Sequence, residues 1–225
     1  TGAGYTNVNA YTNLGQIWQA PLNGQGSTQQ YLYCDSSHPH QLTGIYPLGT
    51  TCANKGSATA VYSASYDAWG NETSRFYSGI PATLSYDALN RLTNWNAGSN
   101  NLEWYVYDAA GNLVLRRTTN SSGTSLTVYA FGLQKLGYSG TGTFGGQTDY
   151  YSLAGHLIGS TDGSNTSYVL TDTQGSVLTS FSASAIQGEQ TYGPYGNPRY
   201  WAGYMTNDKG YTGQVHDFLT GLDYY

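Results

Sequence analysis

The sequence predicts an all-β fold, a long antiparallel β-meander of hairpins that curls into a spiral, barrel-like or shell-like sheet. The 225 residues include 23 Tyr and 5 Trp, which favour strands. The 30 Gly residues favour tight turns, and no stretch repeats apolar residues with a helical period of about 3.6. One short turn-like motif also recurs along the chain. These features together predict many short strands joined by turns.

The recurring motif places Tyr or Thr four residues before Gly or Asn. We take seven of these pairs as repeat anchors: Tyr11/Gly15, Tyr66/Gly70, Tyr86/Asn90, Tyr107/Gly111, Tyr151/Gly155, Thr171/Gly175 and Tyr192/Gly196. Two runs, 66–86–107 and 151–171–192, each advance by 20 and then 21 residues. A spacing in this range is typical of a repeat architecture, whereas an active site is usually assembled once.

One copy, YDAAGNL at 107–113, shows why the motif forms a turn. Tyr107 ends a strand, and the Asp108 carboxylate accepts a hydrogen bond from the backbone two residues further on. Residues 109–110 fit the centre of a type I turn, and Gly111 supplies the left-handed residue. Asn90 replaces this Gly in another copy, because Asn tolerates the left-handed region best among the other residues. The motif therefore predicts a three-residue hairpin with a Gly bulge.

The predicted structural residues of the turns come from four copies of the motif. They are Tyr66, Asp67, Gly70, Asn71, Tyr86, Asp87, Asn90, Tyr107, Asp108, Gly111, Asn112, Tyr192, Gly196 and Asn197.

The segments between these turns alternate in polarity, as half-buried strands do, and too regularly for a disordered chain. In 102–107 one face carries Leu102, Trp104 and Val106, and the other carries Glu103, Tyr105 and Tyr107. In 80–86 the apolar face carries Ile80, Ala82, Leu84 and Tyr86. Further turns are predicted at Ser78-Gly79, Ala97-Gly98 and Ser122-Gly123.

A strand about every ten residues gives a sheet on the order of 18 strands, and open twisted sheets rarely exceed about ten. We therefore expect the sheet to close, to stack on itself or to pair its edges with neighbouring chains.

Charge and hydropathy exclude several partners. The net charge of −5 provides no basic surface for nucleic acid, and no apolar run approaches the roughly 18 residues of a membrane span. The chain begins TGAG, which suggests a processed or excised piece. Cys34 and Cys52 are the only cysteines. We favour a disulfide between them over two buried thiols, and a disulfide favours an oxidising compartment.

Several segments resemble the YD-repeat or RHS (rearrangement hotspot) family, which includes bacterial RHS and toxin-complex shells and the animal teneurins. The resemblance is carried by HPHQLTGI (38–45), YDALNRLTNW (86–95), YYSLAGHLIG (150–159), YVLTDTQGSVLTS (168–180), TYGPYGNPRYWAG (191–203) and GYTGQVHDFLTGLDYY (210–225). The last segments are similar to the RHS repeat-associated core. The resemblance implies a sheet that spirals into a hollow shell, usually secreted or surface-exposed, which in toxins encloses a C-terminal effector.

The chain also departs from the family pattern. The Ala-Arg-Tyr-Tyr-Asp-Pro stretch that normally follows the core is absent, and with it the aspartyl self-cleavage motif and any toxin. Full shells are also far longer. We therefore expect either a fragment or a unit whose open edges are completed by other copies.

The predicted organisation is a single YD-repeat β-domain over 1–225. It comprises irregular repeats with the two cysteines (1–60), regular repeats (61–135), a Gly-rich loop (136–149) and truncated RHS-core-like repeats (150–225).

Motifs that would carry chemistry are weak. Gly140, Gly142 and Gly145 spell GxGxxG, but a strand pattern follows where a dinucleotide site needs a helix. No Walker A, HExxH or GxSxG motif occurs. His38 and His40 with Asp35 are a candidate metal set that lacks a firm further ligand, and the family resemblance explains the His-Pro-His triplet as structural.

Other polar residues have both a structural and a functional interpretation. Asp67, Asp87 and Asp108 could be paired carboxylates for glycoside hydrolysis, but identical turn positions favour capping. His156 and His216 stand alone, and each is interpreted as a hydrogen-bonding residue. Candidate glycosylation sequons begin at Asn71, Asn120 and Asn165. The aromatic residues are interpreted as cross-strand ladders, with surface binding as the alternative.

The sequence therefore predicts a non-enzymatic structural β-scaffold, extracellular or on the cell surface, without catalytic residues, cofactor or metal ion. It is either a segment of an RHS-type shell or a subunit that joins end to end into a filament. One alternative is an adhesion module that recognises glycans or cell-surface proteins through exposed aromatics. Another is part of a toxin-encapsulating capsule. The predicted partners are other copies of the chain or the rest of a longer YD-repeat chain.

Overall fold

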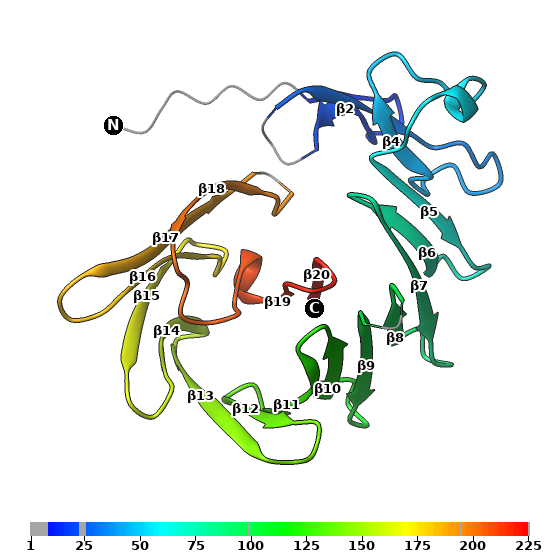
Figure 1. Ribbon diagram of the computed structural model, residues 1–225. Coiled ribbons are helices and arrows are strands. Elements are labelled where there is room, and N and C mark those ends of the chain that lie inside the picture. Colours follow the sequence, from blue (N-terminus) through cyan, green and yellow to red (C-terminus); the bar gives the residue numbers. More distant parts are fainter. Residues whose placement is uncertain (1–8, 23–25, 99, 194, 225) are drawn as a thin grey trace. The chain divides into compact units, whose positions relative to one another are not determined.

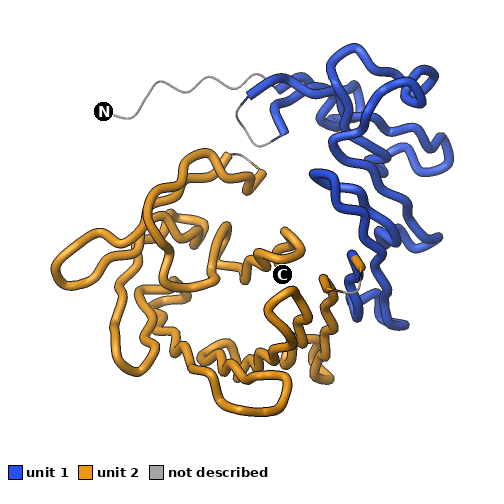
Figure 2. Tube along the Cα trace, viewed as in Figure 1, with its two compact units in different colours: residues 1–97 blue, residues 98–225 orange. Residues whose placement is uncertain are grey.

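The computed structural model describes residues 9–22, 26–98, 100–193 and 195–224. Within these residues the chain is all-β, with strands β1–β20 and two 3-10 turns, η1 (Lys55–Ser57) and η2 (Tyr211–Gly213) (Figure 1). The chain divides into two compact units, residues 1–97 and 98–225 (Figure 2). No helix in the described part of the chain has the length and apolarity to cross a membrane.

Unit 1 is an antiparallel meander in which each strand pairs with the next. Its strands are β1 (Ala10–Tyr11), β2 (Ile17–Pro21), β3 (Thr28–Leu32), β4 (Gly44–Pro47), β5 (Tyr62–Tyr66), β6 (Glu72–Tyr77), β7 (Ile80–Tyr86) and β8 (Leu92–Asn96). The predicted disulfide joins Cys34, after β3, to Cys52, after β4.

Unit 2 continues with a second run of successively paired strands. They are β9 (Leu102–Tyr107), β10 (Leu113–Asn120), β11 (Gly123–Ala130), β12 (Gln134–Ser139), β13 (Phe144–Leu153), β14 (His156–Thr161), β15 (Thr166–Thr171), β16 (Val177–Phe181), β17 (Ile186–Tyr192) and β18 (Pro198–Gly203). A separate hairpin, β19 (Val215–Asp217) and β20 (Leu222–Tyr224), follows η2. The prediction of an all-β antiparallel meander is confirmed.

The C-terminal segment of unit 2, defined as residues 204–224, lies across the concave face formed by β9–β18 (Figure 1, red). This face is the inner face of unit 2. Among the described residues, β9 pairs with β10 and β18 with β17 but not with each other, so the strands of the unit do not close into a barrel.

Strands β12 and β13 occupy most of 136–149, which the sequence predicted as a Gly-rich loop. Glycine is tolerated inside these strands because Gly137 and Gly146 lie directly opposite each other, where neither brings a side chain. Only a short turn at 140–143 separates the two strands.

The apolar cores are small. In unit 1 the buried residues Ala20, Tyr31 and Ile45 form one cluster, and in unit 2 Val169, Val177 and Met205 form another, against which Leu157 packs. Much of the interior is therefore polar or aromatic.

The alternation predicted for 102–107 is present, and the structure shows which face is inside. Glu103 is 1% exposed, whereas Trp104 and Val106 are 36% and 50% exposed. In β7 the apolar side chains of Ala82 and Leu84 are buried instead. The carboxylate face of β9 is inside because charged partners from other elements meet it there, as described below.

Candidate functional site

All seven repeat anchors carry the expected left-handed residue. The φ angle lies between 60° and 92° at Gly15, Gly70, Asn90, Gly111, Gly155, Gly175 and Gly196.

Asp108 shows the hydrogen-bonding pattern of a YD turn. Its Oδ1 accepts from the backbone N–H of Ala110 at 2.9 Å and of Asn112 at 2.8 Å, and its Oδ2 accepts from Asn112 Nδ2 at 2.9 Å. The hydrogen bond from the Asn112 side chain, together with those from the backbone, lowers the pKa of this carboxyl group. A register shift in the β9–β10 pairing follows the turn, as a bulge requires.

The other two YD copies repeat this pattern. Asp67 Oδ1 accepts from two backbone N–H groups, each at 2.9 Å, and Asp87 Oδ1 does so at 2.9 and 3.0 Å. Asn71 Nδ2 donates both to Asp67 Oδ2 at 2.9 Å and to Asn90 Oδ1 at 2.8 Å, so it links two successive turns. Each carboxylate is thus hydrogen-bonded within its own turn, in the position of a cap.

Tyrosines of the motif make contacts away from their turns. Tyr66 donates its hydroxyl hydrogen to the Leu42 carbonyl at 2.8 Å. Tyr86 is partly buried, and burial raises the pKa of its hydroxyl to about 12. The Tyr192 ring lies 5.5 Å from that of Tyr211, measured between ring centroids. Tyr66 and Tyr192 therefore each connect a turn to another part of the same unit.

The turn at Tyr192 differs from the YD copies because Gly193 stands where the capping Asp would be. The backbone bonds remain: Gly193 N donates to Asn197 O at 2.8 Å, and Gly196 N donates to Gly193 O at 3.1 Å.

The spacing of the motif gave the wrong loop length at one turn and missed another turn. At Tyr151/Gly155 the loop has only two residues, Ala154 and Gly155, both with positive φ, because Leu153 pairs with His156. Conversely, Ser139 caps a motif turn between β12 and β13, where its Oγ accepts from Thr143 N at 3.1 Å. The sequence signal was Tyr138 four residues before Gly142, hidden within the GxGxxG pattern.

The histidine candidates lie in ordinary hydrogen-bonded positions. His38 Nδ1 lies 2.9 Å from Asp35 Oδ2, and His40 Nδ1 lies 3.4 Å from Gln16 Nε2. Within the described ranges, no group of three or more His, Cys, Asp or Glu side chains is placed to hold a metal ion.

The candidate glycosylation sequons differ in the state of the acceptor amide. Asn71 Nδ2 donates two hydrogen bonds, and Asn165 Nδ2 donates one to Asp162 Oδ2 at 3.2 Å. Asn120 lies at the β10–β11 hairpin, where its Oδ1 accepts from Ser122 N at 2.9 Å. Modification of these residues stays a prediction.

The inner face of unit 2 carries a buried polar cluster that sequence reasoning missed. At its centre is Glu103 of β9, whose Oε1 accepts from Thr118 Oγ1 of β10 and whose Oε2 accepts from the Tyr105 hydroxyl, both at 2.6 Å. Asp217 of β19 completes the cluster, because its Oδ2 lies 3.5 Å from the same Tyr105 hydroxyl. We call this set, with Arg116, the carboxyl cluster.

Arg116 of β10 supplies the positive charge of the carboxyl cluster. Its Nη1 lies 3.0 Å from Asp217 Oδ2, and its Nε lies 3.8 Å from Glu103 Oε1. Burial, and then the hydrogen bond and charge of Asp217, raise the pKa of Glu103. Burial alone would raise the pKa of Asp217, but the hydrogen bond with Glu103 and the charge of Arg116 lower it. The two carboxyl groups therefore titrate as a pair.

A second buried cluster lies around Asp208 of the C-terminal segment. Its Oδ2 lies 2.9 Å from Lys135 Nζ of β12, and its Oδ1 accepts from the hydroxyl of Tyr150 of β13. Lys209 Nζ lies 5.4 Å from the centroid of the Tyr150 ring. Each buried charge thus has an opposite charge or a hydroxyl donor beside it, as buried charges require.

The C-terminal segment is bound at both of its ends. Near β16 and β17, Val177 N donates to Gly210 O at 3.1 Å, and Tyr204 N donates to Gln187 O at 2.8 Å.

At the far end, the Tyr224 hydroxyl accepts from Leu113 N and donates to Gly111 O, both at 2.8 Å. The Tyr224 ring also lies 6.0 Å from that of Tyr107, measured between centroids. The YDAAGNL turn is therefore the docking point for the end of the segment.

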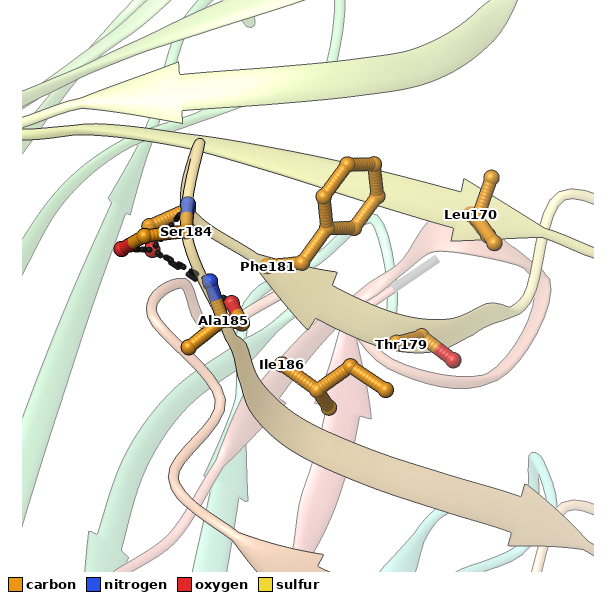
Figure 3. A pocket seen from close by; sticks show the side chains of 7 residues that line it. Leu170, Thr179, Phe181, Ser184, Ala185 and Ile186 are labelled. Carbon is orange, nitrogen blue, oxygen red and sulfur yellow. Dashed lines mark hydrogen bonds between the residues drawn. The ribbon is translucent and has the colours of Figure 1, made fainter.

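A shallow apolar hollow lies on β15–β17, lined by Leu170, Phe181 and Ile186 with Thr179 beside them (Figure 3). Tyr168 stacks on Phe181 at 5.6 Å between ring centroids. The hollow has few polar groups, so it offers little chemistry beyond apolar contact.

No protein-family model matches the chain, and no curated protein matches it. Solved Tc toxin structures do share its fold. The TcdB2-TccC3 complex with Cdc42 matches 97% of this chain at 17% identity and a TM-score of 0.52. TcdB2-TccC3 and a Tc holotoxin pore from Photorhabdus luminescens each match 97% of it at 18% identity and a TM-score of 0.51. This chain spans 14% to 15% of the length of those chains. The likeness shows a fold of the RHS or YD-repeat type.

Proposed function

We propose that this protein is a non-enzymatic structural scaffold of a secreted or cell-surface assembly, built from YD repeats. The observation that carries the proposal is the use of the polar side chains: Asp67, Asp87 and Asp108 each bind their own turn. The carboxyl cluster likewise binds the C-terminal segment to the sheet, and Glu103 at its centre is 1% exposed. A carboxylate held in this way stabilises structure.

Two further observations support an extracellular scaffold. The fold is shared with Tc toxin structures, and the Cys34–Cys52 disulfide suits an oxidising compartment. The partners we propose are other copies of this chain or the rest of a longer YD-repeat chain. The chain would then act as a segment of an RHS-type shell or capsule, or as a subunit that joins end to end into a filament.

The two assemblies are separated by measuring the molar mass of the purified chain by light scattering from about 1 to 100 µM, with electron microscopy of the same samples. An end-to-end subunit gives mass that grows with concentration and particles of one constant width. A single monomer mass across the range would contradict end-to-end joining and leave the shell segment. A hydrolytic activity that Glu103→Gln or Asp108→Asn abolishes would overturn the scaffold proposal altogether.

A second candidate function is binding of glycans or cell-surface proteins, and it rests on exposed aromatic side chains. Trp69 and Trp201 are 79% and 61% exposed, and Tyr204 is 72% exposed. Exposed aromatic rings on a rigid sheet offer stacking surfaces for sugar rings and anchors for protein interfaces. A glycan array probed with the wild type and with Trp201→Ala tests this candidate, and an array without signal would remove the glycan form of it.

A further inference from the structure

The attachment of the C-terminal segment to β9 and β10 places two carboxyl groups beside one cation. Glu103 and Asp217 share the Tyr105 hydroxyl, which lies 2.6 Å from Glu103 Oε2 and 3.5 Å from Asp217 Oδ2. They also share Arg116, which lies 3.0 Å from the Asp217 carboxylate and 3.8 Å from that of Glu103. A pair of buried carboxyl groups in contact cannot both ionise at low cost, because like charges repel strongly where water is excluded. One guanidinium group compensates only one carboxylate.

The other described groups of unit 2 that face the carboxyl cluster are neutral or paired with each other. Tyr105 of β9, Thr118 of β10 and Tyr129 of β11 face the cluster, and burial raises the pKa of both phenols, so they stay neutral. Beyond Tyr129 lies Asp208, whose negative charge is paired with Lys135 of β12.

Lys209 adjoins Asp208 and the Tyr150 ring rather than the carboxyl cluster, and burial lowers its pKa. Within the described part of unit 2, Arg116 is the cation that contacts both carboxyl groups.

We propose that the Glu103–Asp217 pair holds a single proton that fastens the C-terminal segment to β9 and β10, so that loss of this proton on alkalinisation releases the segment from unit 2. With the proton present, the pair donates one hydrogen bond internally and carries one negative charge, which Arg116 balances. Without it, the pair carries two negative charges across the β9–β19 contact. Opening the contact then lets water solvate the carboxylate of Glu103.

The direction and size of the effect follow from proton linkage. In the docked form the pKa of Glu103 is raised from 4.5 to about 8, whereas in the released form it returns to its ordinary value. Between these two values the docked form binds one proton more than the released form. The equilibrium constant for release therefore rises about tenfold per pH unit in that range and levels off above it. The stabilisation of the docked segment by Glu103 is fully present below the ordinary pKa of glutamate. It is lost as pH rises through the raised pKa of the docked form.

His216 adds a second pH dependence in the same direction. A hydrogen bond with Asp223 raises the pKa of this imidazole, and the two residues belong to β19 and β20. Its contribution is present whether or not residue 103 ionises. The difference between the wild type and a variant at Glu103 therefore isolates the carboxyl pair.

Hydrogen–deuterium exchange of the full chain from pH 5.5 to 9 tests the proposal, with each rate corrected for the intrinsic pH dependence of exchange. Peptides that cover 214–224 report release, and peptides within β12 and β13 report the sheet. In the wild type we expect the protection of 214–224 to fall as pH rises. Up to pH ~8 this fall should exceed the fall in Glu103→Gln by about a factor of ten for each pH unit. Gln keeps the size and a donor toward Asp217 but cannot ionise.

Glu72→Gln is the matched control. Glu72 of β6 in unit 1 is a partly buried glutamate that forms a bidentate pair with Arg75, both contacts at 2.9 Å. This variant should show the wild-type pH slope for 214–224. Equal slopes in the wild type and Glu103→Gln would overturn the proposal, as would simultaneous loss of protection in β12 and β13.

A second measurement needs no variant. At neutral pH the infrared spectrum of the wild type should contain the carbonyl stretch of a protonated carboxylic acid, and this band should disappear between pH 7 and 9. A spectrum without the band at pH 7 would overturn the proposal even if Glu103→Gln failed to fold.

Discussion

Substitution of Gly111 tests whether the YDAAGNL turn depends on its left-handed residue. Gly111 has φ of 92°, and a Cβ added there would meet no atom within 4 Å. A side chain therefore has room, and the expected cost comes from the backbone alone. Forcing an L-residue into this region costs about 1 to 2 kcal/mol. Gly111→Val, with its branched Cβ, should destabilise by more than 1 kcal/mol, and Gly111→Asn should cost less, because Asn90 occupies the equivalent position with φ of 60°.

The assay is urea unfolding followed by tryptophan fluorescence, with the slope of the transition checked for constancy between variants. Gly56→Ala is the control: Gly56 lies in η1 outside the left-handed region and also has open space around its Cβ position. That variant should be neutral or slightly stabilising, because Ala restricts the unfolded chain. Wild-type stability of Gly111→Val, or equal losses in Gly56→Ala and Gly111→Val, would refute the interpretation of the turn.

Three other predictions concern single contacts. Reduction of the Cys34–Cys52 disulfide, which spans 18 residues, should destabilise unit 1 by about 3 kcal/mol, measured as a lower unfolding midpoint with reductant than without. Tyr224→Phe removes two hydrogen bonds to the YDAAGNL turn. It should weaken docking of β20 by roughly 1 to 3 kcal/mol, measured as faster hydrogen exchange of β20. Tyr204→Phe is the control and should leave this exchange unchanged, because the Tyr204 ring is 72% exposed. The pKa of Asp108 is lowered in the folded turn. The stabilisation that its carboxylate gives to the turn is therefore present above the ordinary aspartate pKa and is lost as pH falls through the lowered pKa. The acid midpoint of the wild type should therefore differ from that of Asp108→Asn, and coincident acid transitions would contradict this.

The turns could be predicted from sequence because their information is local. Asp108 and Gly111 act within four residues of each other, and each has a backbone requirement that few residue types satisfy. The strands followed from the same logic, because alternation is visible in any six residues. The turn at Tyr138 was missed only because a more familiar glycine pattern overlapped it.

The carboxyl cluster could not be predicted, because its members are distant in the chain. Tyr105 and Asp217 are 112 residues apart, and nothing in the local sequence of either indicates the other. The alternation of β9 was visible, but which face is buried depends on Arg116 and Asp217 arriving from other elements. An apolar face with Trp104 would ordinarily be placed inside, and only the tertiary contacts reverse that choice.

The docking of Tyr224 onto Gly111 also sets an order of events in folding. This contact spans 113 residues, so its closure costs far more chain entropy than any hairpin of the meander. During synthesis β9 to β13 can pair as they emerge, but Arg116 and Lys135 gain their carboxylate partners Asp217 and Asp208 only after the C-terminal segment has been made. Until then these charges need water, and the inner face of unit 2 stays hydrated. The C-terminal segment, which follows β9–β18 in the chain, is therefore the part that excludes water from the inner face of unit 2, and the sheet stays solvated until that segment has docked.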